Sequence, residues 1–108
     1  MTSDRFNEIL EETLQKCIDT LGTKSNEYAT EDKLHNFKVA AVIQNCTPIT
    51  VLAGMMAKHT VSVYDLIQKQ EHGVGVSKEM WEEKIGDSIN YLILLSALVQ
   101  EKIDNWEF

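Results

Sequence analysis

Two short rows of polar side chains interrupt apolar stretches of this sequence, and their residue types could do chemistry. The first row is Lys58, Ser62 and Asp65, and the second is Glu83, Asp87 and Asn90. Both follow the spacing i, i+4, i+7, which places each row along one side of a helix. Carboxylates on such helices are costly to bury unless cations or hydrogen-bond donors satisfy them. The question is therefore what satisfies these two rows.

The turn between the rows predicts that they lie at the same height. A short Gly-containing connection, HGVGV, is centred near Val74, so the flanking helices should pack antiparallel. Residues equally distant from that centre then lie side by side. Asp65 should lie near Glu83, and Lys58 near Asn90 and the following tyrosine. The rotation of each helix about its own axis is not fixed by this estimate.

Three interpretations of the rows remain open. If they face each other, Asp65, Glu83 and Asp87 converge, and Mg²⁺ with its preference for oxygen ligands would neutralise charge that Lys58 alone cannot. Alternatively, the polar side chains form a buried hydrogen-bond network that fixes the helix register. A third interpretation is simple exposure of both rows to solvent.

Apolar spacing elsewhere predicts an all-α fold, a bundle of four to five antiparallel helices in a single domain, residues 1–108. An N-terminal amphipathic helix is expected within residues 1–22, ending at Gly22, followed by a polar connection over residues 23–37. Capping signals then favour three more helices, Asp32 or Leu34 to Gln44, Pro48 (after Thr47) to about Gln70, and Ser77 to about Asn105.

Composition limits the class of partner. The net charge is −7, from 17 acidic and 10 basic residues, so a groove for nucleic-acid backbone is not expected. A nucleotide bound through a metal ion stays compatible with this charge. No basic-then-apolar leader is visible, and the longest apolar run, about 11 residues, is too short to span a bilayer. We therefore expect a cytoplasmic protein with no membrane contact, in which Cys17 and Cys46 are reduced thiols.

The C-terminal helix also predicts self-association. Its apolar stripe runs from Trp81 to Trp106, which is longer than a domain of this size can cover. Large uncovered apolar patches usually mark an interface, so a homo-oligomer, dimer or tetramer, is expected.

The motifs on these helices carry a resemblance. EKIGDSINYLILL, which begins at Glu83, resembles the last core helix of the all-α NTP pyrophosphatases, the MazG and dUTPase-like group. A nearer similarity is to small phage and prophage proteins of the nucleotide-modification-associated type. Those proteins have the motif K-x-x-E/D-Y, then a Lys-containing helix, then the motif D-x-x-N-Y. In this sequence the same order is KSNEY from Lys24, then AGMMAKHTVSVYDL, then DSINY from Asp87. The core motifs occupy residues 24–100.

This resemblance implies a Mg²⁺-dependent nucleoside triphosphate pyrophosphohydrolase. Mg²⁺ would be held by Asp65, Glu83 and Asp87, with Glu27 as a further ligand, and catalysis would use Glu83, Asp87 and Lys58. The nucleotide would be bound by six residues, Lys24, Tyr28, Asn36, His59, Asn90 and Tyr91. The sequence departs from the two-pair acidic pattern of that group, because Lys58, His59 and Ser62 stand where a second acidic pair is expected.

A second hypothesis is a non-catalytic helical accessory protein that acts through protein–protein contacts. The incomplete acidic set and the long stripe ending at Trp106 favour it. Replacing Asp87 separates the two hypotheses, because only the enzyme requires that carboxylate for Mg²⁺.

Overall fold

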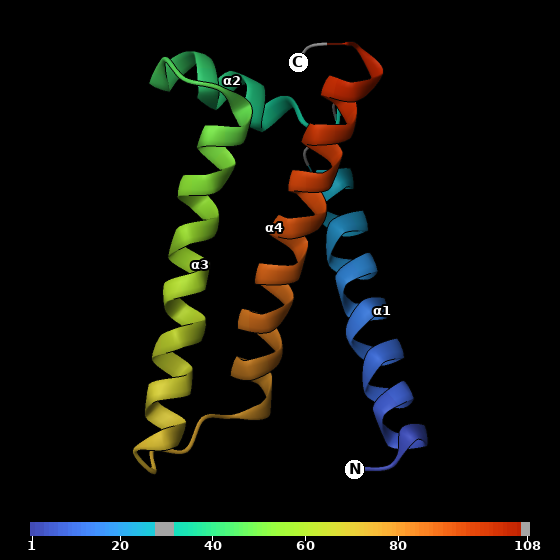
Figure 1. Ribbon diagram of the computed structural model, residues 1–108, viewed down its shortest axis with the longest axis vertical. Coiled ribbons are helices and arrows are strands. Elements are labelled where there is room, and N and C mark those ends of the chain that lie inside the picture. The colour runs from blue at the N-terminus through green and yellow to red at the C-terminus, as the bar shows by residue number, and fades with distance from the viewer. Residues whose placement is uncertain (28–31, 107–108) are drawn as a thin grey trace.

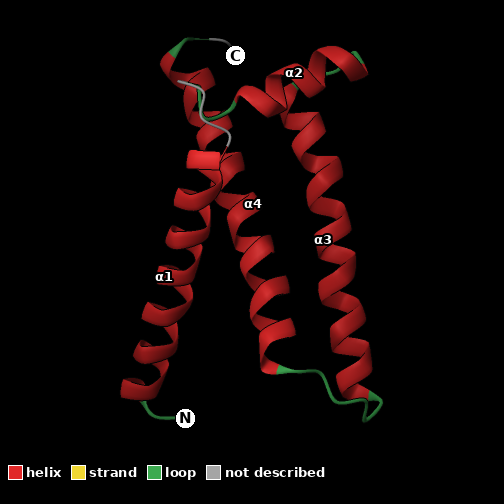
Figure 2. Ribbon diagram, turned by 180° about the vertical axis from the view of Figure 1, so that it is seen from behind, coloured by secondary structure: helices red, strands yellow, loops and turns green. Residues whose placement is uncertain are grey.

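The computed structural model is built from four helices and has no strand in the described part of the chain (Figures 1 and 2). It describes the backbone of residues 1–27 and 32–106, and the side chains of residues 1–22 and 32–106. The helices are α1 (Ser3–Glu27), α2 (His35–Gln44), α3 (Pro48–Glu71) and α4 (Lys78–Asp104). The predicted all-α class is confirmed.

The predicted starts of α3 and α4 are confirmed, since each has its capping side chain in place. Thr47 Oγ1 accepts a hydrogen bond from the Thr50 N–H, with Pro48 at the first helical position. Ser77 Oγ accepts one from the Met80 N–H at the start of α4. Asn45 ends α2 in the left-handed conformation, at φ 53°, as its side chain allows.

The predicted end of the first helix is wrong. Instead of stopping at Gly22, α1 continues to Glu27, so the first residues of the expected polar connection are helical. A glycine within a helix costs only about 0.5–1 kcal/mol relative to alanine. That cost is too small to end a helix by itself.

Three long helices stand side by side, and α2 lies across one end (Figure 1). α3 and α4 are antiparallel, as the turn predicted, whereas α1 runs parallel to α4 and diverges from it toward the N-terminus (Figures 1 and 2). α2 and α3 meet at a bend of 98°, and only together do they reach the length and apolarity of a membrane span. No single helix in the described part of the chain does.

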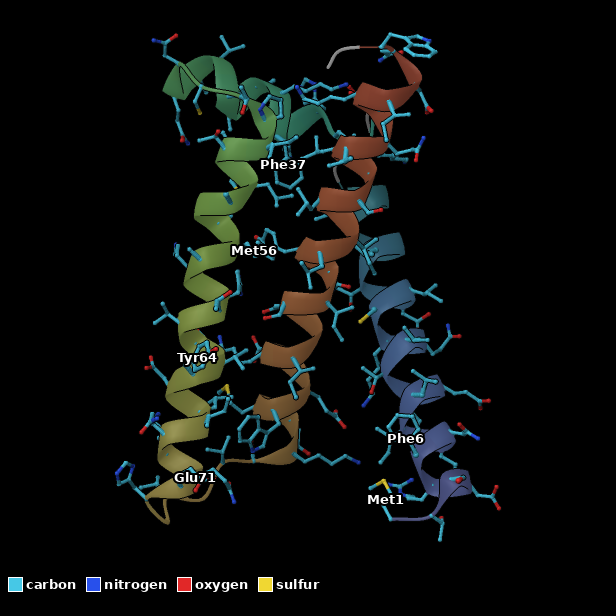
Figure 3. The ribbon with its side chains drawn as sticks, in the orientation of Figure 1. Met1, Phe6, Phe37, Met56, Tyr64 and Glu71 are labelled. Carbon is cyan, nitrogen blue, oxygen red and sulfur yellow. The ribbon has the colours of Figure 1, made fainter. Side chains whose placement is uncertain are left out.

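The core is small and lies at the end of the molecule that α2 closes. Its buried centre is Leu34, Leu52 and Leu98, from the start of α2, from α3 and from α4. Phe37 and Met56 pack against this centre, and Met56 points from α3 toward α4 (Figure 3). Because the core is at one end, the opposite ends of α1 and α4 are free to separate.

An ion-pair network fastens α2 to α4 beside this core. Lys38 Nζ lies 2.6 Å from Asp32 Oδ2 and 2.9 Å from Glu101 Oε1. The hydrogen bond to Asp32, and then that to Glu101, raise the pKa of Lys38, and the bond from Lys38 lowers the pKa of Asp32. These groups are more than a third exposed, so the network contributes at most about 1 kcal/mol.

Candidate functional site

The polar side chains that meet between α3 and α4 form one cluster. His59 Nδ1 of α3 lies 3.5 Å from Asp87 Oδ2 of α4, and the His59 and Tyr91 rings lie 4.7 Å apart, tilted by 32°. The His59 and Asp87 side chains are 28% and 24% exposed. We refer to these three residues, together with the buried Asn90 one turn from Asp87 on α4, as the α3–α4 cluster. It is reachable from solvent yet mostly shielded.

The predicted register of α3 against α4 is confirmed, and the structure shows which side of α3 faces α4. His59 meets Asp87 and Tyr91, the level expected from a turn centred near Val74. The α3 residue that faces α4 there is His59 rather than its neighbour Lys58. One residue of rotation on a helix is about 100°, which turns Lys58 to solvent.

A sequence signal for His59 was present. Leu52, Met56, Val63 and Leu66 follow the spacing of a packed helix face, and His59 occupies the one missing position in that series. A histidine in an apolar face has to be accommodated by a polar partner on the facing helix. Asp87 offers such a partner.

Three of the predicted catalytic and metal residues lie at the surface. Lys58, Asp65 and Glu83 are all exposed, and they do not join Asp87. Among the described residues, no group of three or more His, Cys, Asp or Glu side chains could hold a metal ion together. A Mg²⁺ ion bound jointly by Asp65, Glu83 and Asp87 therefore stays a prediction of the sequence.

Asn90 is the buried polar residue of the cluster. Its side chain is 8% exposed, and its Oδ1 atom has no hydrogen-bond partner in the part of the chain described. It lies one turn along α4 from Asp87, so the two share one side of the helix. An unpaired buried carbonyl typically costs about 1–3 kcal/mol. This cost would be recovered if a ligand placed a donor there.

The pKa of Tyr91 is raised by the same surroundings. Burial raises the pKa of Tyr91, and the nearby charge of Asp87 raises it further. Like any protonated tyrosine, its hydroxyl can donate a hydrogen bond, and its ring presents a face beside His59.

Ser62 and Asp65 belong to a separate open depression near the turn. Ser62 Oγ donates a hydrogen bond to the Lys58 carbonyl at 3.1 Å, so it is satisfied within α3. The depression has a volume of about 430 Å³ and is lined by residues of α3, α4 and the turn, including Ser62, Asp65, Lys69, Val76, Met80 and Lys84. In the row Lys58, Ser62 and Asp65, the first residue therefore faces solvent and the other two line this depression, so the row does not face Asp87.

Of the remaining predicted nucleotide-binding residues, Lys24, Tyr28 and Asn36, only Asn36 has a described side chain. Asn36 is exposed in the first turn of α2. Tyr28 lies outside the described residues, as do the side chains of Lys24 and Glu27, although their backbone belongs to α1. Their predicted roles stay predictions.

Comparison of the chain with protein-family models, with curated proteins and with solved structures finds no match in any of the three. The function is therefore argued from the cluster itself.

Proposed function

We propose that this protein binds a nucleotide at the α3–α4 cluster. The observation that carries the proposal is the buried Asn90 carbonyl, which has no hydrogen-bond partner among the described residues and which directly precedes Tyr91, whose ring lies against His59. A nucleobase offers what this arrangement lacks, because it combines ring N–H or amino donors with a flat face. The predicted resemblance to nucleotide-processing proteins points the same way.

Each cluster residue has a distinct role in this proposal. Asn90 Oδ1 accepts a hydrogen bond from the base or sugar, and Tyr91 or His59 stacks on the base. Lys58, one residue from His59 and exposed, can reach phosphate oxygens at the mouth of the cluster.

Mg²⁺ fits this proposal as an ion that arrives with the phosphates. Asp87 offers one partly exposed carboxylate, and Mg²⁺ sites often combine one or two carboxylates with water and substrate phosphates. Such an ion would offset the repulsion between Asp87 and the phosphates. The pyrophosphate assay described next shows whether the bound nucleotide is hydrolysed.

Titration calorimetry of the chain with deoxynucleoside triphosphates and Mg²⁺, combined with an assay of pyrophosphate release, tests the proposal. Asp87→Asn should weaken Mg²⁺-dependent binding about 10- to 150-fold, the 1.5–3 kcal/mol typical of charge-assisted contacts. The matched control is Glu83→Gln, an exposed acid one turn earlier on α4, which should leave affinity unchanged.

Three outcomes separate the interpretations. Binding lost only in Asp87→Asn supports the α3–α4 cluster, with or without turnover. Equal losses in both variants would restore the three-acid metal site. An absence of binding by any nucleotide at millimolar concentration would refute the proposal.

A second candidate is an accessory protein that works through protein–protein contacts without binding a nucleotide. Exposed apolar side chains favour it, above all Trp106 at 92% and Val42 at 82% exposure. In this case Asp87→Asn would change stability by about 1 kcal/mol and leave partner binding intact.

A further inference from the structure

Two rows of apolar side chains on α1 and α4 are exposed in the single chain. The α1 apolar row comprises Phe6, Leu10, Leu14 and Ile18, which are 58%, 46%, 45% and 62% exposed. The α4 apolar row comprises Ile85, Leu92 and Ile103, which are 40%, 56% and 48% exposed. Spacings of four on α1, and of seven and eleven on α4, keep each row on one side of its helix.

Both rows turn to the same side of the α1–α4 pair. On α1, the buried Cys17 marks the side that packs on α4, and Leu14 and Ile18 lie next to it around the helix. On α4, Tyr91 and Leu98 mark the side against α3, and the α4 apolar row is turned well away from them. Since α1 and α4 run parallel (Figure 1), helical geometry directs the two rows to the face that α3 does not cover.

Charged side chains are sparse on this face. Between Ile85 and Ile103, the other residues that share the side of the α4 apolar row are uncharged, among them Ser88, Ser96 and Val99. On α1, the α1 apolar row is flanked by Asn7, Thr13 and Cys17, and Glu11 lies at its edge, while most of the other acids lie on the opposite side. Interface cores are depleted of charge in this way, whereas solvated helix faces are rich in it.

The surface of the chain is too large for a compact monomer. Its accessible area is 7952 Å², against about 6,100 Å² for a folded monomer of 12.3 kDa. Its radius of gyration is 16.4 Å, against about 13 Å for a compact domain of this length. The excess area, roughly 1,900 Å², is of the size that one subunit buries in an obligate dimer.

We infer that a second copy of this chain covers the α1–α4 face. Two parallel helices with apolar rows on one side form half of a four-helix bundle. The same pair of helices from a second copy, packed face to face, completes the bundle. A two-fold axis makes such a face its own complement, so two identical surfaces suffice. The inference is independent of the proposed nucleotide site.

The expected assembly explains the divergence of α1. Phe6 lies on the part of α1 that has separated from α4 (Figure 3), and in one chain it packs on little else. In the dimer, the N-terminal halves of α1 and α4 gain packing neighbours from the second copy, which the core at the α2 end does not supply.

Sedimentation equilibrium of the full chain at micromolar concentration tests the dimer. The wild type should have twice the mass of 12.3 kDa, and Ile18→Lys should shift it to the monomer mass. The matched control is Val61→Lys, a β-branched residue of similar exposure on α3, at 58% against 62%, which should remain dimeric. Circular dichroism confirms that each variant is helical.

Any other pattern overturns the inference. A wild type of monomer mass excludes the second copy, and a dimer that Ile18→Lys leaves intact places the interface elsewhere. Dissociation by Val61→Lys alone would assign it to α3. Should Ile18→Lys fail to fold, urea unfolding of the wild type decides, because the midpoint of a dimer rises with protein concentration and that of a monomer does not.

Discussion

At the scale of single residues, Asn90 is where stability and the proposed function oppose each other. Its carbonyl is buried and has no partner within residues 1–22 and 32–106, and Ile89 and Tyr91 stand on either side of it in the sequence. Most buried polar groups in folded proteins are paired, so an unpaired one calls for an explanation. Ligand binding provides one, since the ligand supplies the missing donor.

Asn90→Leu therefore should have opposite effects on stability and binding. Leucine has a similar volume and removes the unpaired carbonyl, so we expect the free energy of unfolding to rise by about 1 kcal/mol. Nucleotide affinity should fall about 5- to 150-fold, corresponding to roughly 1–3 kcal/mol. Urea unfolding and calorimetric titration of the same preparation measure both quantities.

The alternative of a structural hydrogen-bond network predicts the reverse for stability. If Asn90 fixes the register of α3 on α4, the leucine variant should unfold more easily, by the 1 kcal/mol or more that a buried network loses. Greater stability with unchanged nucleotide affinity would leave Asn90 without a function.

At the scale of elements, local signals predicted most of the fold. The starts of α3 and α4 depend on Thr47, Pro48 and Ser77, whose effects act within one turn of the chain. The height of His59 opposite Asp87 followed from the length of one turn. The rotation of α3 did not follow, because it is decided by packing of Leu52 and Met56 against α4, which is a tertiary effect.

The site was predictable to the same extent. Asp87, Asn90 and Tyr91 were identified from spacing and resemblance, and the structure brings Asp87 and Tyr91 to one residue of α3. The direction of Lys58 and Asp65 was left open, since a row at i, i+4, i+7 does not reveal which direction it faces. The apolar series interrupted by His59 held that information.

α1 illustrates how a weak local signal is outweighed. Gly22 lies inside α1, and a Cβ atom built on it would have nothing within 4 Å. Gly22→Ala should therefore raise the free energy of unfolding by about 0.5–1 kcal/mol, through helix propensity and a less flexible unfolded chain. Urea unfolding measures the change.

Gly73→Ala is the matched control. Its surroundings are equally open, but its φ is +76°, which disfavours alanine, so this variant should lose stability. If Gly22→Ala destabilised the protein as much as Gly73→Ala, α1 would have to end near Gly22 after all.

At the scale of the whole molecule, the chain has the shape of a subunit. Its core lies at one end, whereas α1 and α4 expose apolar rows along their length. The α3–α4 cluster and the α1–α4 face involve different sides of α4, with Tyr91 and Leu92 as adjacent residues on them. Assembly and nucleotide binding can therefore occur together.

The central claim is that a nucleotide occupies the α3–α4 cluster, and an NMR titration tests it most directly. Amide and side-chain shifts are followed as a deoxynucleoside triphosphate with Mg²⁺ is added to the full chain. We expect the largest changes at the Asn90 side-chain amide and at His59, Asp87 and Tyr91. Saturation with nucleotide that leaves the Asn90 side-chain amide unmoved would contradict the claim.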